Sequence, residues 1–501
     1  MKNNLYKYLI NHKKNTPNKI ALIFENYKIT YQDLVELIDL TEIYLLNNFN
    51  IRNKDRIAIL AQNRIEYIFL LYACAKIGSI LVPINWRLTR FEVKNILNDV
   101  KPKVIFTENK FKKVTNNFLK DTKTNIISIN LNSDFFDDIK KQENFNLNSH
   151  NKIKNNIDKA LLIIYTSGTT GKSKGAVLTQ KALFYNSINS LHMHQFNKKD
   201  IILTVIPLFH VGGLNIQTIP ALQIGATVVI LRKFDLMETM KTLKNFRPTH
   251  TVFVPSIMKE ILKLKNWKLK LKSLKAITTG STIVSPELIK TYEKNSIKVI
   301  QVYGSTETCP IAISQKIDEK RLPYGNTGKP ALKTKIKLFN NNNNNNYGEI
   351  GVKGYNLFSY YWNDTNNTKK AFTNGWFMTG DFAKKNNNNQ YFILGRNKDI
   401  IISGGENIYP AEVERIINQD KNIDESAVIG VPDDKWEEVP IAFIKIKNKN
   451  FSSKKIVKNM QTKLAKYKIP KKLIKIKQVP KNALGKIDYK ILKEYYYSAK
   501  Q

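Results

Sequence analysis

The chain has 501 residues, which is too long for one compact core and predicts about three domains or subdomains. A hydrophobic content of 42% is ordinary for a soluble globular protein, and two cysteines are too few for a disulfide framework, so we expect a reducing, cytoplasmic setting. The net charge of +40 is typical of nucleic-acid-binding proteins, but the lysines are spread along the whole chain beside abundant asparagine and form no stripe.

Other features of the chain also indicate a soluble protein that does not bind nucleic acid. Zinc-finger spacing, aromatic RNA-binding strands and basic heptads are not found, so we expect no nucleic-acid partner. The longest apolar run, residues 67–75, is far shorter than the roughly 20 residues of a membrane helix. A basic surface attracts anionic small molecules and acidic lipid, which leaves peripheral membrane contact open, and the oligomeric state is open too.

From residue 56 onward, apolar runs of strand length alternate with amphipathic helical patterns. Strands are predicted at 56–61, 79–82 and 104–106, with helices at 64–77 and 91–97 between them. Further strands are predicted at 160–164, 176–178, 201–205, 227–231, 251–254, 276–278 and 299–302. This order predicts a layered α/β core whose strands are mostly parallel and covered by helices.

The most informative segment lies between the predicted strands 160–164 and 176–178. Residues 166–175 read Thr-Ser-Gly-Thr-Thr-Gly-Lys-Ser-Lys-Gly. Glycines let backbone amides approach a ligand, while hydroxyls and lysines add donors and positive charge, so a polyphosphate-binding loop is favoured over a solvated turn. It is not a Walker A loop, because that motif spaces its two glycines more widely than Gly168 and Gly171.

Polar segments also follow three other predicted strands. They are residues 207–210, 280–282 and 303–307. Ligands of parallel α/β sheets bind beyond the carboxyl ends of the strands. We therefore expect these segments and the 166–175 loop to line one shared pocket.

Beyond residue 325 the pattern changes to pairs of short strands, at 335–339 with 349–353 and at 382–384 with 391–394. Asparagine tracts at 340–346 and 386–389 separate the members of each pair, where asparagine suits the tip of a hairpin. A small α/β unit follows from about residue 399, of ordinary domain size, in which Pro410 begins a helix.

Taken together, these segments resemble the superfamily of adenylate-forming enzymes, which includes acyl- and aryl-CoA ligases, adenylation domains of peptide synthetases and beetle luciferases. The resemblance extends from residue 18 to residue 489, with the motifs in family order. It implies an N-terminal AMP-binding domain over residues 1–396, made of layered α/β subdomains with a small β-barrel-like subdomain. A small, mobile α+β C-terminal domain would follow over residues 397–501.

The resemblance also implies a set of site residues. The ATP ligands would be Thr166, Ser167, Gly168, Thr169, Thr170, Gly171 and Lys174 at the phosphates, Gly280, Ser281 and Tyr303 at adenine, and Asp381 and Arg396 at ribose. Glu307 would hold Mg²⁺, and the catalytic residues would be Thr306, His210 and Lys486. Lys398 would be the hinge, and Gly404, Gly405, Glu406 and Lys435 would bind coenzyme A.

Two positions depart from the family pattern. Ser173 stands where proline is commoner, and Gly280-Ser281-Thr282 replaces a Gly-Gly-Ala/Ser turn. The second departure is compatible with the backbone role of the turn, and it does not fix the shape of the pocket beside it.

The implied reaction joins a carboxylic acid to coenzyme A through an acyl-AMP, with ATP and Mg²⁺. Residues 82–89, 359–362 and 401–414 look most like bacterial fatty-acyl-CoA ligases of medium to long chain preference. The alternative is an o-succinylbenzoate–CoA ligase, whose pattern includes residues 210–213 and 465–470, and aryl-CoA ligation comes third. A non-catalytic, basic nucleic-acid-binding protein of the same fold is disfavoured by the presence of Glu307, Asp381, Arg396 and Lys486.

Overall fold

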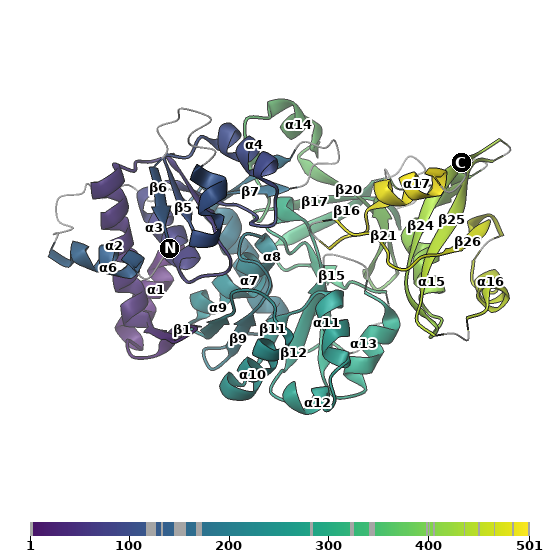
Figure 1. The fold of residues 1–501 in the computed structure, drawn as a ribbon, viewed down its shortest axis with the longest axis horizontal. Coiled ribbons are helices and arrows are strands. Elements are labelled where there is room, and N and C mark those ends of the chain that lie inside the picture. The colour runs from purple at the N-terminus through teal and green to yellow at the C-terminus, as the bar shows by residue number, and fades with distance from the viewer. Residues whose placement is uncertain are drawn as a thin grey trace.

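The structure, a computed structural model, describes residues 4–116, 127–131, 134–144, 157–166, 173–280, 284–320, 325–339, 346–396, 399, 401–403, 406–434, 436–448, 451–464, 466–482 and 485–498. Up to residue 396 these residues form a large unit of three sheets with their helices (Figure 1). Residues 399–498 form a small unit at one end of it (Figure 1).

The first sheet of the large unit has seven strands in the order β18-β8-β7-β4-β3-β5-β6. Strands β7, β4, β3, β5 and β6 are parallel, whereas β8 and β18 are antiparallel to their neighbours. Their bounds are β3 Arg56–Leu60, β4 Ile80–Pro83, β5 Val104–Thr107, β6 Ile127–Asn130, β7 Ala160–Thr166, β8 Lys174–Thr179 and β18 Tyr360–Tyr361.

The second sheet has nine strands in the order β15-β14-β13-β12-β11-β9-β10-β1-β2, parallel from β13 to β1. Every strand predicted between residues 56 and 302 is confirmed, with ends that differ by at most two residues. The bounds are β1 Ile20–Phe24, β2 Tyr27–Thr30, β9 Ile201–Thr204, β10 Thr227–Ile230, β11 His250–Val252, β12 Ala276–Gly280, β13 Lys298–Tyr303, β14 Ile313–Ser314 and β15 Lys329–Pro330.

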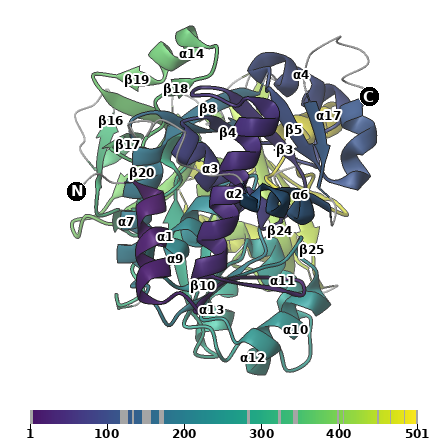
Figure 2. The same ribbon diagram turned by 90° about the vertical axis from the view of Figure 1, so that its left-hand side faces the viewer.

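Helices join the two sheets through one large apolar core. The core combines strands of both sheets with residues of α1, α2, α3, α7 and α9, and Figure 2 shows α1 and α2 running across one side of the molecule. Helix α3 is buried all round, in keeping with its continuous apolar sequence. The bounds are α1 Leu5–Asn15, α2 Tyr31–Phe49, α3 Glu66–Ile77, α4 Arg90–Val100, α7 Gln180–His194, α9 Ile219–Ile224, α10 Leu236–Phe246, α11 Pro255–Leu262 and α13 Pro286–Glu293.

The third sheet is antiparallel and forms the small β-subdomain that the resemblance implied. Its strands are β16 Thr334–Phe339, β17 Tyr347–Gly354, β19 Phe372–Thr373, β20 Trp376–Lys385 and β21 Tyr391–Arg396. Asn386 to Asn389 form the turn between β20 and β21, which confirms a hairpin tip, and Asn389 has a φ of 57°. The first tract joins the antiparallel strands β16 and β17, although residues 340–345 lie outside the described residues.

The small unit has a five-stranded sheet between helices. Helices α15 and α16 pack on one face of the β24-β25 hairpin and α17 packs on the other, and α15 begins at Pro410 as predicted. The elements are β22 Ile401–Ser403, β23 Glu406–Ile408, α15 Pro410–Ile417, β24 Ile423–Asp433, β25 Glu437–Ile446, α16 Ser453–Gln461, β26 Lys472–Lys475 and α17 Tyr489–Ser498. Lys259 of α11 joins the units: its Nζ lies 2.8 Å from the carbonyl oxygen of Asp424 and 3.1 Å from Oδ1 of the same residue.

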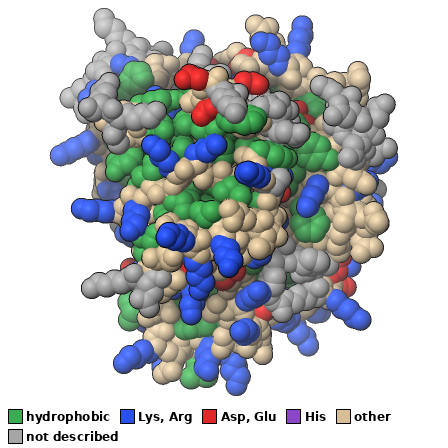
Figure 3. Space-filling model, turned by 90° about the vertical axis from the view of Figure 1, so that its right-hand side faces the viewer, with side chains coloured by type: hydrophobic (Ala, Val, Ile, Leu, Met, Phe, Trp, Pro, Cys, Tyr) green, Lys and Arg blue, Asp and Glu red, His purple; other side chains and the backbone are tan. Residues whose placement is uncertain are grey.

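The surface of the small unit carries many dispersed basic side chains. In Figure 3 the lysine and arginine side chains are scattered singly among hydrophobic and polar ones on this face. Across the part of the chain that the structure describes, no helix has both the length and the apolar composition needed to cross a bilayer.

Candidate active site

Neighbouring strand ends bring three of the predicted segments together. Strands β9, β11, β12 and β13 are parallel and adjacent in the second sheet. Their carboxyl ends therefore lie at one edge of the sheet, where residues 207–210, Gly280 and Tyr303 are found. The phosphate loop leaves β7 of the first sheet and returns as β8, with Thr166 paired to Lys174. The loop itself, residues 167–172, lies outside the described residues.

Two glycines allow the segments predicted to lie beside the nucleotide to pack closely. A Cβ atom at Gly280 would lie 2.5 Å from the carbonyl oxygen of Val302 on the adjacent strand. A Cβ atom at Gly304 would lie 1.7 Å from the carbonyl oxygen of Pro310. Both positions therefore exclude any side chain, and Gly280 serves the contact between β12 and β13.

The ribose-binding acid predicted from the sequence meets the predicted adenine-stacking residue. The hydroxyl group of Tyr303 donates to Oδ2 of Asp381 at 2.8 Å. Asp381 is paired with Arg396 between β20 and β21, which brings the two predicted ribose ligands to adjacent strands. The side chain of Arg396 is not among those described.

A second carboxylate near Asp381 was missed by the sequence analysis. Oε1 of Glu349 accepts a hydrogen bond from the backbone N–H of Gly380 at 2.9 Å. Burial, aided by the charge of Asp381, raises the pKa of Glu349. The predicted motif around Asp381 gave no sign of this partner, which comes from the neighbouring strand β17.

The predicted metal ligand lies beside the predicted phosphate ligand Lys174. Oε1 of Glu307 accepts from the hydroxyl group of Tyr361 at 2.8 Å, and Nζ of Lys174 lies 5.2 Å from the centre of the Tyr361 ring. Thr306 begins a short 3₁₀ turn, η5 Thr306–Thr308, that carries Glu307. Residues Lys174, Tyr303, Glu307, Tyr361 and Asp381 are called the nucleotide side below.

The nucleotide side fits Mg²⁺ held together with a polyphosphate. Among the described residues, no three His, Cys, Asp or Glu side chains gather as a complete metal site. Mg²⁺ is commonly held by one or two carboxylates together with water and substrate phosphates. Glu307, a single half-buried carboxylate on the turn η5 that follows β13, matches that donor set.

His210, predicted to lie near the substrate carboxylate, ends the segment that follows β9. It precedes a short helix, α8 Val211–Gly213, which continues into a π-helix, η4 Leu214–Thr218. Burial, together with the positive charges of Arg87 and Lys486, lowers the pKa of His210 to about 3. His210 is therefore neutral near pH 7, and Lys486 of the small unit lies close enough for its charge to act on it.

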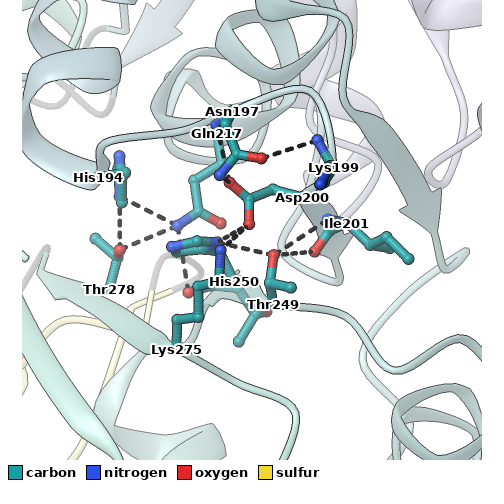
Figure 4. Close-up of polar contacts among 11 residues, drawn as sticks. His194, Asn197, Lys199, Asp200, Ile201, Gln217, Thr249, His250, Lys275 and Thr278 are labelled. Atoms are coloured by element: carbon teal, nitrogen blue, oxygen red, sulfur yellow. Dashed lines mark hydrogen bonds and ion pairs between the residues drawn. The ribbon is translucent and has the colours of Figure 1, made fainter.

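A buried polar network includes Gln217 of η4 (Figure 4). Nδ1 of His194 donates to the carbonyl oxygen of Ser190 at 2.9 Å, so Nε2 is the acceptor for the hydroxyl group of Thr278 at 2.8 Å and for Nε2 of Gln217 at 3.2 Å. Burial, with the nearby His250, lowers the pKa of His194 to about 3. Gln217 lies on η4 and Thr278 lies on β12, so the network joins η4 to the strand that ends at Gly280.

The network continues toward the surface through His250 and Asp200. Nδ1 of His250 lies 3.0 Å from the hydroxyl oxygen of Thr249 and 3.8 Å from Oδ1 of Asp200, which accepts from Nζ of Lys275 at 2.6 Å (Figure 4). No sequence motif pointed to this network. His210, η4 and the polar network of His194, Gln217 and Thr278 are called the acid side below.

Lys486 is presented on a tight turn of the small unit. The backbone N–H of Lys486 donates to Oδ1 of Asn482 at 3.1 Å, and the N–H of Asn482 donates back to the carbonyl oxygen of Lys486 at 2.8 Å. Gly485 has a φ of 76°, a conformation that favours glycine. These contacts fix the backbone of the lysine just before α17.

The remaining predicted residues can be placed only in part. Ser281, Lys398, Gly404, Gly405 and Lys435 lie outside the described residues, as do Ser167, Gly168, Thr169, Thr170 and Gly171 of the loop. Glu406 begins β23, but its side chain is not among those described.

The chain matches two family models. "AMP-binding enzyme" matches residues 10–362, and "AMP-binding enzyme C-terminal domain" matches residues 412–486.

Similar proteins are named as CoA ligases or synthetases. The indoleacetate–CoA ligase of Aromatoleum aromaticum is 34% identical over 494 residues, with 96% of each chain covered. The long-chain-fatty-acid–CoA ligase of Mycobacterium tuberculosis is 31% identical, with 90% of each covered. The o-succinylbenzoate coenzyme A synthetase of Bacillus subtilis, solved with ATP and magnesium ion, superposes with a TM-score of 0.81 at 28% identity, covering 96% of this chain and 98% of that one.

The family models together span most of the chain, and the fold agrees with them. The chain therefore belongs to the family of AMP-binding, adenylate-forming enzymes and is an AMP-forming acid–thiol ligase that uses ATP, Mg²⁺ and coenzyme A.

Proposed function

We propose that this ligase activates a carboxylic acid with an apolar body, first a medium- or long-chain fatty acid, and transfers it to coenzyme A. The observation that carries the site assignment is the pair of side-chain hydrogen bonds that join Tyr303 to Asp381 and Tyr361 to Glu307. They support a nucleotide side gathered around Glu307 and Asp381, with Lys486 proposed as the catalytic lysine that faces the acid side.

The chemical problem is that hydroxide is a poor leaving group from a carboxylic acid. The acid carboxylate attacks the α-phosphate of ATP, pyrophosphate leaves and an acyl-AMP forms. Two anions must meet in this step, so preorganised positive charge and hydrogen-bond donors lower the barrier. Lys486 and Thr306 would supply these at the reacting atoms, and neutral His210 would position the carboxylate without carrying a proton.

On the nucleotide side, Thr166, Lys174 and the 167–172 loop would hold the β- and γ-phosphates. Asp381, oriented by Tyr303, would accept hydrogen bonds from the ribose hydroxyls, with Arg396 beside it on the adjacent strand. When bound at Glu307, Mg²⁺ would neutralise charge on the phosphates.

The second step requires coenzyme A to reach the acyl-AMP. We propose that residues 1–396 and 397–501 are separate domains and that the smaller rotates about Lys398. Rotation would withdraw Lys486 and bring Gly404, Gly405, Glu406 and Lys435 toward the thiol arm. The carbonyl carbon of the adenylate then forms a bond to the thiol sulfur, and AMP leaves.

An arylacetic acid is a second candidate substrate. The relative from Aromatoleum aromaticum is 34% identical over nearly the whole chain and is named for indoleacetate. The acid side also combines apolar side chains, such as Ile216 and Val252, with the polar network of Gln217 and Thr278. Fatty acids, arylacetic acids and o-succinylbenzoate should therefore be compared as substrates in one assay.

The purified chain should release pyrophosphate from ATP only when a suitable acid is present, and should then form the thioester when coenzyme A is added. Fatty acids of increasing length, indoleacetate, o-succinylbenzoate and benzoate should be compared by kcat/KM. A maximum among fatty acids would support the first assignment, whereas a maximum at indoleacetate would replace it with the second. Absence of acid-dependent pyrophosphate release across the panel would refute the proposed substrate classes.

A further inference from the structure

A short segment, residues 358–362, joins the two parts of the nucleotide side. Strand β18 pairs with β8, the strand that ends the phosphate loop, with Tyr361 opposite Ala176. The backbone N–H of Trp362 donates to the carbonyl oxygen of Gly175 at 2.7 Å. At the other end of the segment, the N–H of Phe358 donates to the carbonyl oxygen of Glu307 at 2.8 Å. The segment is thus bonded both to the phosphate-loop strand and to the metal-ligand turn.

Tyr361 makes a side-chain contact to each of these parts. Its hydroxyl group donates to Oε1 of Glu307 at 2.8 Å, and its ring lies beneath Nζ of Lys174 at 5.2 Å from the ring centre. Phe358 packs against the same ring, with centroids 4.7 Å apart. Only 8% of Tyr361 is exposed, whereas 40% of Tyr360 is exposed, as expected when neighbouring residues of a strand point to opposite faces.

These contacts constrain two charged groups of opposite sign. A hydroxyl donor fixes the rotamer of the Glu307 carboxylate and leaves Oε2 for another partner. A ring face attracts the ammonium group of Lys174, whose Nζ lies 5.2 Å from the ring centre. One side chain thus contacts both charged groups, so the position of each depends on Tyr361.

We propose that Tyr361 is a positioning residue that orients Glu307 toward the metal and Lys174 toward the phosphates. The proposal rests on the function proposed above, because it assigns Glu307 to Mg²⁺ and Lys174 to ATP. Groups that orient a metal ligand typically change metal affinity by about 10- to 100-fold when they are removed.

Binding measurements without acid or coenzyme A test this role apart from turnover. ATP affinity is measured by calorimetry across a range of free Mg²⁺, and in EDTA, for the wild type, Tyr361→Phe and Tyr361→Leu. Tyr361→Phe should raise the Mg²⁺ concentration needed for half-maximal ATP binding by about tenfold or more, and leave affinity in EDTA unchanged. Tyr361→Leu, which also lacks the ring, should in addition weaken ATP binding in EDTA.

Two comparisons separate positioning from a general loss of structure. Tyr360→Phe removes a hydroxyl from the neighbouring exposed side chain and should leave both measurements unchanged. In a Glu307→Gln background, Tyr361→Phe should cause no further loss of Mg²⁺ dependence, because the hydroxyl acts through the carboxylate.

The outcomes distinguish this proposal from the proposed function. A wild type whose ATP affinity depends on Mg²⁺, together with a Tyr361→Phe variant that has the same dependence, would overturn the role of Tyr361 alone. A wild type that binds no ATP, or binds it without regard to Mg²⁺, would overturn the assignments at Glu307 and Lys174 and this proposal with them. An equal weakening by Tyr361→Phe in EDTA and in Mg²⁺ would show a structural role and likewise overturn it.

Discussion

The nucleotide side and the acid side are built in different ways. On the nucleotide side, Tyr303, Tyr361 and Asp381 come from three separate strands and Glu307 from the turn η5, and direct hydrogen bonds between side chains fix their positions. On the acid side, His210 leads into a π-helix whose packing is set by apolar neighbours and by a network of neutral groups. Charged groups are thus held at fixed points on the nucleotide side, whereas the acid side consists mainly of buried apolar and neutral polar groups.

This difference explains why the enzyme class is easier to infer than its acid. Recognition of phosphates and ribose needs specific charged and hydroxyl groups, which leave recognisable residues in the sequence. An apolar acid is selected by the volume that helices leave beside a sheet, and many combinations of apolar residues produce similar volumes.

Lys486→Ala should have the largest effect, because Lys486 belongs to neither side and acts where they meet. Loss of one preorganised charged group costs about 3–4 kcal/mol of transition-state stabilisation, or about 10²- to 10³-fold in the adenylation rate. Acid-dependent exchange of pyrophosphate into ATP measures this step. Thioester formation from supplied acyl-AMP and coenzyme A should be retained.

A matched control for Lys486→Ala is available on the same turn. Lys481 is exposed and pairs with Glu425 at 2.9 Å, so Lys481→Ala should leave both half-reactions close to wild type. An equal loss of both half-reactions in Lys486→Ala would contradict the assignment of this lysine to adenylation.

Asp381→Asn should weaken the nucleotide side without altering the acid side. The change removes the charged acceptor of the Tyr303 hydroxyl group and of the ribose, and hydrogen bonds to charged groups contribute about 1.5–3 kcal/mol. We expect KM for ATP to rise about 10- to 100-fold and KM for the acid to change little. The exposed Asp318 supplies the control Asp318→Asn, and an equal rise in both KM values would show that the two sides are not independent.

His194→Gln should have the smallest effect, which concerns stability and its dependence on pH. The pKa of His194 is lowered from 6.5 to about 3, so the unfolded chain binds a proton below pH 6.5 that the folded protein excludes. The contribution of neutral His194 is therefore complete above pH 6.5 and decreases as the pH falls. By pH 5 the loss amounts to about 2 kcal/mol.

Urea unfolding at pH 7.5 and pH 5 measures the contribution of neutral His194 to the free energy of unfolding. The wild type should lose about 2 kcal/mol more of its free energy of unfolding between the two pH values than His194→Gln does. The exposed His192, on the same helix, provides the control His192→Gln; burial lowers the pKa of His192 as well, but this side chain is exposed, so its removal should take away a smaller part of the pH dependence than His194→Gln does. Equal losses of unfolding free energy in the wild type and His194→Gln would mean that the folded protein does not exclude the proton from His194.

The sequence predicted most of the parallel strands of the first two sheets, because their apolar runs are long and their connections regular, but it did not predict β1 or β6. It also singled out Tyr303, Glu307 and Asp381 as candidate ATP and metal ligands, since each lies in a short motif. It did not predict Tyr361 or Glu349 as site residues, because their hydrogen bonds join strands that are distant in sequence and are made by common side chains. The polar network was missed for a similar reason: a buried histidine has no distinctive neighbours along the chain.

The turn at Asn386 to Asn389 has a consequence for how this enzyme can change over time. Asp381 and Arg396 are paired on strands β20 and β21. Four further residue pairs, from Phe382–Gly395 to Lys385–Tyr391, separate them from the turn. Mutations that lengthen or dilute the asparagine tract are absorbed at the tip, because the ladder fixes the register of the paired strands. Changes of composition can therefore accumulate at the turn without moving Asp381 and Arg396, the predicted ribose ligands at the other end of the hairpin.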